Sequence, residues 1–157
     1  MHMVWLLMLF VTLVTSQDPQ GSSNDRGTMV MGFDQEKTAH HFYLYADGGA
    51  IDIAVRDSAD TQDRDAIRSH LPHIATMFAS GNFEAPMLVH DRAHVPGTAV
   101  LKQKADTIRY RYEDTQAGGR VDIVTADRNA LSAVHEFLRY QITEHQTHDP
   151  LTVGTRP

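Results

Sequence analysis

The sequence predicts an α+β fold: two ββα units whose strands form one antiparallel sheet, with two helices packed on one face of it. Two segments each hold a pair of stretches that alternate apolar and polar residues around a Gly-Gly turn, and a helical periodicity follows each pair. Both segments contain the pattern Gly-Gly-x-Φ-Asp-Ile, where Φ is aliphatic, at Gly48–Ile53 and Gly118–Ile123. This recurrence favours an internal duplication, and the generic pattern of two hairpins is the alternative.

The chain opens with residues 1–16, which we interpret as a secretory signal peptide. Its apolar run, Met3–Val14, is too short to span a bilayer, and small residues precede a plausible cleavage after Ser16. The segment before the run carries His2 and no Lys or Arg, which is unusual for a signal. We expect a periplasmic or secreted protein with no membrane span after processing; a buried or membrane-dipping N-terminal helix is the alternative.

Three further regions follow the signal. Residues 17–28 are rich in Gly, Ser, Asn and Asp without apolar periodicity, which predicts a flexible tether. Residues 29–146 form the predicted single α+β domain. Residues 147–157 contain Pro, Gly and Thr and little to bury, which predicts a flexible tail.

Within the domain, the alternating segments predict hairpins over 42–55 and 108–125, and the periodic segments predict helices over about 60–80 and 127–145. The long link between the units predicts a short strand at Pro86–His90 and a helical turn near residues 98–104. Long loops inside compact domains are often functional, so this link is a candidate part of a site.

The composition of the chain excludes several classes of partner and site. The chain has 157 residues, 41% of them apolar, which suits one domain with a real core. Its net charge is -6 and its 14 Lys and Arg residues form no basic cluster, which argues against nucleic acid as a partner. There is no cysteine, so disulfides, a thiolate nucleophile, covalent c-type haem and a blue-copper site are excluded.

Potential metal ligands gather in the first unit. Six histidines lie between positions 40 and 94, and all four methionines of the expected mature chain lie in or just before that half. These methionines are Met29, Met31, Met77 and Met87. The second unit holds His135, His145 and His148 and no methionine.

Helical geometry places some of these ligands side by side. A core stripe is formed by Ile67, Leu71, Ile74 and Phe78. His70, His73 and Met77 then share one flank of that stripe. Pro72 predicts a kink or a restart of the helix, which makes a His73 and Met77 pair the more secure one.

Further ligands are expected from neighbouring segments. In an extended Pro86–His90, Met87 and His90 face opposite ways. On the first strand, His40 is expected to face the core and His41 the other side, and one of them closes the site. The predicted metal ligands are His40, His41, His70, His73, Met77, Met87 and His90.

Imidazole with thioether favours copper, since methionine is a soft ligand that suits Cu(I). Zinc sites seldom use methionine, and haem with His/Met or His/His ligation is a weaker candidate. A methionine beside a helix stripe usually belongs to the core, and single surface histidines usually bind nothing. We expect an exported protein for copper binding, transfer or sequestration, with an envelope protein as a further partner.

Two other functions remain open. One is a metal-free interaction module of the cell envelope that contacts its partner through Tyr43, Tyr45, Tyr110 and Tyr112. The other is a haem- or metal-dependent enzyme. No phosphate-binding loop, nucleophile elbow or H-E-x-x-H pattern occurs, so no catalytic residue is predicted.

Several motifs resemble those of a family of small exported bacterial proteins of uncharacterised function. They are "RGTMVMGFDQEKTAHHF", "IRSHLPHIATMFASGNFEAPMLVHD", "VPG", "GGRVDIVT" and "AVHEFLRYQITEH", and the resemblance spans roughly residues 26–150. It implies that Met31-Gly32-Phe33 belongs with the His40-His41 segment, and it makes Pro72 a departure from an expected helix former. Some members are labelled aspartate carbamoyltransferase, but the chain is about half that enzyme's length and lacks a Ser-Thr-Arg-Thr phosphate-binding run.

Overall fold

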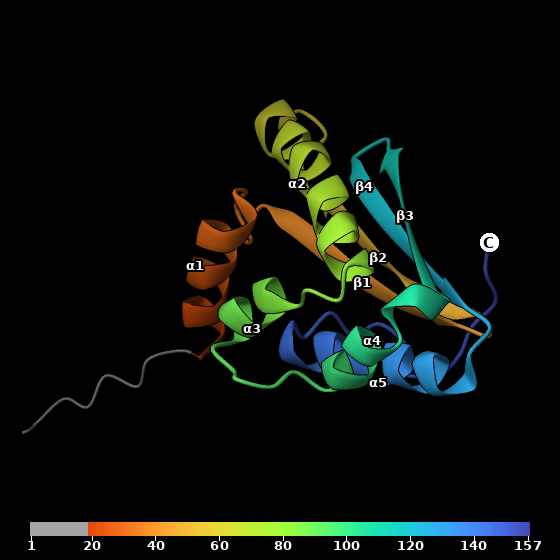
Figure 1. The fold of residues 1–157 in the computed structure, drawn as a ribbon. Helices are drawn as coiled ribbons and strands as arrows, with labels where there is room; N and C mark the ends of the chain where they lie inside the picture. The colour runs from red at the N-terminus through yellow and green to blue at the C-terminus, as the bar shows by residue number, and fades with distance from the viewer. Residues whose placement is uncertain (1–18) are drawn as a thin grey trace, which may run out of the picture.

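The computed structural model describes residues 19–157 and has the predicted α+β architecture (Figure 1). A four-stranded antiparallel sheet has the order β1-β2-β4-β3. Its strands are β1 (Thr38–Tyr45), β2 (Gly48–Val55), β3 (Ile108–Thr115) and β4 (Gly118–Thr125). The helices are α1 (Pro19–Met31), α2 (Thr61–Ala79), α3 (Glu84–His90), α4 (Thr98–Gln103) and α5 (Arg128–Glu144), with a 3-10 turn, η1, at Ala105–Thr107.

The predicted signal peptide, residues 1–16, lies outside the described residues. Within residues 19–157, no helix has the length and apolar character needed to cross a membrane.

The two hairpins share one strand register. Each pair of facing residues in β1 and β2 has a counterpart in β3 and β4 whose residue numbers are higher by 70. For example, Thr38 faces Val55, and Ile108 faces Thr125. At the centre of the sheet, β2 pairs with β4 so that Ile51 faces its own counterpart, Val121. The strand pairing therefore relates the two units by an approximate twofold axis.

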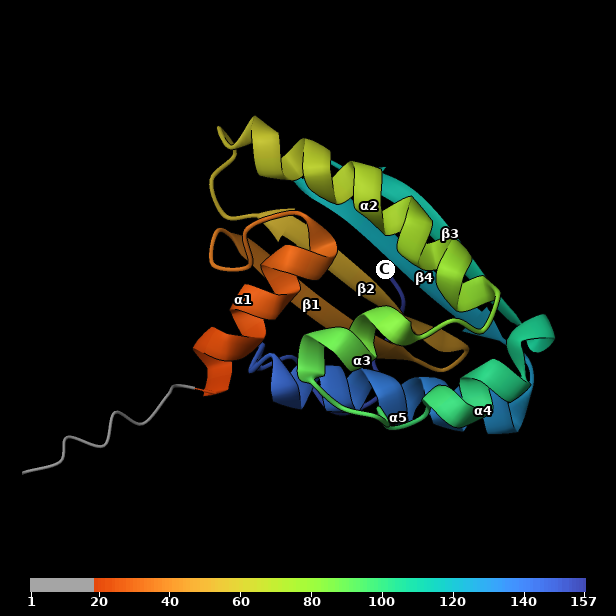
Figure 2. The same cartoon turned by 60° about the vertical axis from the view of Figure 1, so that its left-hand side comes forward.

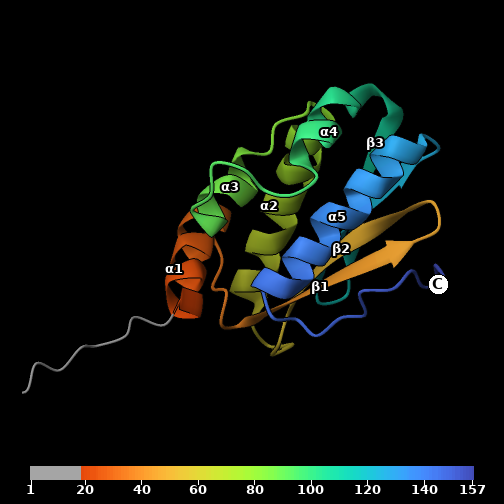
Figure 3. The ribbon, with the colours of Figure 1, turned by 90° about the horizontal axis from the view of Figure 1, so that it is seen from below.

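Each long helix packs on the hairpin of the other unit. Helix α2 follows the first hairpin but packs on β3 and β4, where a Cβ at Gly119 would lie 3.1 Å from Leu71. Helix α5 packs along β1 and β2 (Figure 3). Its Leu138 lies so close to Gly49 that a side chain at this position would overlap it. The core lies between this face of the sheet and the two helices.

Helix α2 runs without interruption from Thr61 to Ala79 with Pro72 inside it, so it does not restart at the proline. Asp60 caps its start by accepting the backbone N–H of Asp63 at 3.1 Å. The predicted core stripe is confirmed, since its members are all buried: Ile67, Leu71, Ile74 and Phe78.

The predicted strand at Pro86–His90 is wrong, because this segment belongs to helix α3. Asn82 accepts the backbone N–H of Glu84 at 2.9 Å, and Pro86 stands in the first turn, where a missing N–H costs nothing. The helix ends at Asp91, whose backbone is left-handed. In Figure 2, α3 lies between the two long helices.

The predicted tether over 17–28 is also wrong from residue 19 onward, where α1 begins. Helix α1 lies beside α3, and Arg26 Nε donates to the carbonyl of Val89 at 3.0 Å (Figure 2). Contacts with the rest of the domain stabilise this helix, whose own sequence has no apolar stripe to predict it.

The C-terminal segment, predicted as a flexible tail, contacts the edge strand β1. Gly154 N donates to the carbonyl of Leu44 at 2.9 Å, and Gly154 forms a single parallel bridge with Tyr45. Arg156 lies over the Tyr45 ring, 4.5 Å from its centre.

Candidate functional site

The predicted ligands of α2 do not form a site with one another. His73 is exposed, and Met77 packs on the hydrophobic core. The rings of His70 and His73 have centres 6.3 Å apart, while the buried Phe33 stands between His70 and the first strand. This flank of the helix therefore carries two neighbouring imidazoles, but the side chains of His70, His73 and Met77 do not point toward a common position.

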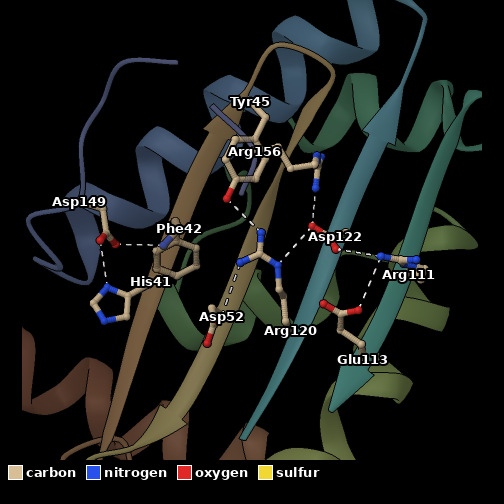
Figure 4. A network of polar contacts seen from close by, with 10 residues as sticks. All are labelled: His41, Phe42, Tyr45, Asp52, Arg111, Glu113, Arg120, Asp122, Asp149 and Arg156. Carbon is tan, nitrogen blue, oxygen red and sulfur yellow. Dashed lines mark hydrogen bonds and ion pairs between the residues drawn. The ribbon is translucent and has the colours of Figure 1, made fainter. Parts of the chain in front are cut away.

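The other predicted ligands divide between two faces of the sheet. Met87 packs on the core, and His41 points away from the helices, where its Nδ1 lies 2.9 Å from Asp149 (Figure 4). Of the predicted ligands, His40 and His90 line one cavity, and His40 and His41 line another. The expected orientations of His40 and His41 on β1 are thus correct, and the predicted seven-residue set does not assemble. Across residues 19–157, no three His, Asp or Glu side chains stand in a position to hold one metal ion.

An inner cavity of about 70 Å³ lies between the sheet, α2, α3 and α5. Its walls are mainly apolar, and among the residues that the structure describes no Asp, Glu, Lys or Arg lines it. The donor groups among its lining residues are Met31, Gln35, His40, His90, Gln141 and His145. The cavity therefore offers imidazole, amide and thioether groups in a setting without compensating charge.

Three histidines from three elements meet at this cavity, and we call them the histidine cluster: His40 of β1, His90 of α3 and His145 at the end of α5. The ring of His145 stands edge-on to both others, with centres 5.4 Å from His40 and 5.0 Å from His90. It also stacks on Phe42 at 5.6 Å. His145 is thus the shared neighbour that links the two predicted residues.

Two ring nitrogens of the cluster are buried without a hydrogen-bond partner. His90 Nε2 lies 3.0 Å from Gln141 Oε1, and with the amide in this orientation Nε2 carries the proton and donates. The lone pair of neutral His90 is then on Nδ1, which is buried and unpartnered, as is Nε2 of His40. Buried polar atoms are normally satisfied, so each of these two nitrogens is available to a water or to a ligand.

Burial keeps the cluster neutral. It lowers the pKa of His145 to about 3, and the neighbouring His40 and His90 act in the same direction. Burial, with nearby Arg56 and His41, lowers the pKa of His40 to about 4. Burial also lowers the pKa of His90, against the opposing effect of its hydrogen bond to Gln141. Neutral imidazoles are the form that binds metal ions.

The approximate symmetry shows what is special about this half of the domain. The counterpart of His40 in the second hairpin is Tyr110. The counterpart of His145 is Phe78, because His145 lies seven residues after Leu138 and Phe78 lies seven residues after Leu71. These two leucines pack on the equivalent glycines of the two hairpins, Gly49 and Gly119. Tyr110 and Phe78 also meet edge-on, at 5.8 Å. Both halves thus place an aromatic pair at this point, and only one half makes it from two imidazoles.

His145 was not among the predicted ligands, although the sequence contained a signal for it. It follows Leu138 by seven residues and Gln141 by four, so it extends the apolar stripe of α5 by one turn. A histidine in that position faces the core. Without the crossing of α5 onto β1, however, nothing connects it to His40.

The four tyrosines of the proposed interaction surface do not share a face. Tyr110 and Tyr112 pack against the core under α2. Tyr43 and Tyr45 stack on the opposite face, and Arg120 donates to the Tyr45 hydroxyl at 3.0 Å (Figure 4).

No family model matches the chain, and no curated protein or solved structure matches it.

Proposed function

We propose that this protein binds a single Cu(I) ion at the histidine cluster and serves in copper binding, transfer or sequestration. One observation carries the proposal: neutral imidazoles surround an apolar cavity and leave His40 Nε2 and His90 Nδ1 buried without partners. The proposal keeps the metal predicted from the sequence and moves the site from the α2 flank to His40, His90 and His145.

The ring spacing suits shared coordination. An imidazole nitrogen about 2 Å from an ion places the ring centre about 3 Å from it, so two such rings have centres about 5 to 6 Å apart. The separations of His145 from His40 and from His90 fall in this range. In the described structure the three rings are not in position to hold one ion together, so binding requires them to rotate toward a common point. Gln141 would act as the outer partner, because its contact with Nε2 of His90 leaves Nδ1 to bind the metal.

The absence of lining charge favours a monovalent ion. The cost of placing an ion in an apolar setting grows with the square of its charge, so a divalent ion pays about four times the penalty of a monovalent one. No carboxylate among the lining residues offsets that penalty. Met31, which lines the same cavity, adds a soft thioether that suits Cu(I) and gives little to Zn²⁺.

The size of the cavity argues against haem. A cavity of about 70 Å³ has room for an ion and a few waters, and a porphyrin is far larger. The proposal that the protein acts in the periplasm or outside the cell rests on the sequence of residues 1–16 alone.

The test is an anaerobic competition titration of the purified protein with Cu(I) buffered by bicinchoninate. We expect one Cu(I) per chain with a Kd below about 1 µM, and weaker binding of Zn²⁺. Replacing His145 with Phe keeps the ring stacked on Phe42 and should weaken Cu(I) binding at least about 100-fold.

The matched control is His73→Gln with Met77→Leu, which removes two predicted ligands that lie outside the cavity. This variant should bind Cu(I) as the wild type does. The proposal fails if the wild type takes up no stoichiometric Cu(I), or if His145→Phe binds it with unchanged affinity.

A further inference from the structure

A second hollow, polar and open to solvent, adjoins the inner cavity where β1 begins and α5 ends. This outer hollow has a volume of about 440 Å³. Gln35, His40 and His145 line both it and the inner cavity. Two residues of the histidine cluster therefore lie on the boundary between the outer hollow and the inner cavity.

Two more histidines, His41 and His148, line the outer hollow. His41 Nδ1 lies 2.9 Å from Asp149 Oδ1, and the other oxygen of Asp149 accepts the backbone N–H of Phe42 at 2.9 Å (Figure 4). A carboxylate fixed in this way accepts the Nδ1 proton and leaves the lone pair on Nε2. Metal-binding histidines use this same carboxylate pairing to orient their rings and raise their basicity.

His148 is held at the rim by a tight turn after α5. Thr147 N donates to the carbonyl of Ile142 at 3.2 Å, and Thr147 Oγ1 donates to Asp149 Oδ2 at 2.7 Å. His148 itself has a left-handed backbone with φ of 61° and an exposed side chain. The same carboxylate, Asp149, thus anchors both the turn that carries His148 and the ring of His41.

The charged groups that line the outer hollow do not repel a cation on balance. Its charged lining groups include one carboxylate, Glu36, and one guanidinium, Arg56, whose formal charges balance. A cation entering from solvent meets exposed imidazole before it meets the buried ones. His41 and His148 line the outer hollow alone, His40 and His145 line both spaces, and His90 lines the inner cavity alone.

We infer that the outer hollow is the entry route for the ion and that His41 and His148 form a second, weaker Cu(I) site that passes it inward to His145. This inference rests on the proposed function and adds a transfer step to it. The step is an exchange of ligands on Cu(I): an imidazole of the outer pair leaves as an imidazole of the cluster binds, with no change in oxidation state.

The test measures the rate of transfer by stopped flow, mixing the apoprotein with Cu(I)-bicinchoninate and following the loss of the chelator's colour. The double variant His41→Asn with His148→Ala should take up Cu(I) at least about tenfold more slowly than the wild type. Its equilibrium affinity for the first Cu(I) should stay within about twofold, and the weak second equivalent should disappear. The exposed His73→Ala on α2 is the matched control and should transfer at the wild-type rate.

Because His41 contacts Asp149, the single variant His148→Ala is measured as well. Within residues 19–157 the His148 side chain forms no hydrogen bond, and its removal should also slow uptake. Wild-type rates with an intact second equivalent in both variants would overturn the inference and leave the inner site standing. No uptake by the wild type would overturn the proposed function and this inference together.

Discussion

The stability of the fold should depend on pH through the histidine cluster. His40 and His145 have pKa values of about 4 and about 3 in the native protein, against an ordinary value of 6.5. Between these values and 6.5, the unfolded chain binds protons that the native chain does not bind. The stability is therefore full above pH 6.5 and falls as the pH falls toward the native pKa values.

The size of the effect follows from these shifts. One pKa unit corresponds to about 1.4 kcal/mol, so at pH 5 each of the two histidines costs about 2 kcal/mol of unfolding free energy and the pair about 4 kcal/mol. Burial also lowers the pKa of His90, which adds to the loss. A loss of this size is a large part of the unfolding free energy of a typical domain. Acid should therefore unfold the protein at a pH well above the pKa values of its carboxylates.

Urea unfolding at several pH values between 5 and 7.5 measures this loss, with His145→Phe as the informative variant. Phenylalanine keeps the stacking on Phe42 and removes one titrating group. The unfolding free energy should therefore fall between pH 7.5 and 5 by about 2 kcal/mol less than in the wild type, or about 0.8 kcal/mol less per pH unit on average. The exposed His94→Gln should keep the wild-type slope, because its side chain is solvated in both states. Equal slopes for His145→Phe and the wild type would refute the claim that the cluster is neutral when folded.

Four further outcomes are expected. Cu(I) affinity should change little between pH 7 and 5, because the pKa values of His40 and His145 lie below that range; a loss of about tenfold per pH unit would contradict this. Phe137→Ala should cost about 3 to 5 kcal/mol in urea unfolding, since the ring is buried against Phe78 and Phe83. Gly49→Ala should destabilise by about 1 to 3 kcal/mol because its Cβ meets the Leu138 side chain, whereas Gly154→Ala, with its nearest atom 3.9 Å away, should stay within about 0.5 kcal/mol. Arg156→Ala should speed hydrogen exchange at Gly154 and lower stability by about 1 kcal/mol or less, because it removes the partner of Asp47 and one partner of Asp122.

The parts of the fold that the sequence predicts are those set by local periodicity. The stripe from Ile67 to Phe78 and the alternation that turns His40 inward and His41 outward depend on fixed spacings, and both are as expected. The repeated Gly-Gly pattern likewise marks two hairpins with the same register.

The parts that the sequence does not predict depend on contacts between distant segments. Five residues from Pro86 to His90 fit a strand or a helix equally well by pattern, and the first-turn position of Pro86 decides between them only once the start of the helix is known. Helix α1 depends on its packing against α3.

The site itself shows the same limit. His40, His90 and His145 come from three elements, and the crossing of α5 onto β1 and β2 is what joins them. Clustering in the sequence pointed to His40 and His90, which are two of the three residues of the proposed site. It also favoured His73 and Met77, which lie close in sequence but do not line the cavity.

The most direct test of the central claim is X-ray absorption at the copper edge of the Cu(I)-loaded protein. The account predicts a Cu(I) edge with two or three imidazole nitrogens at about 2 Å, at most one sulfur at about 2.3 Å, and loss of an imidazole in His145→Phe. A first shell without imidazole, or one that is the same in His145→Phe as in the wild type, would contradict it.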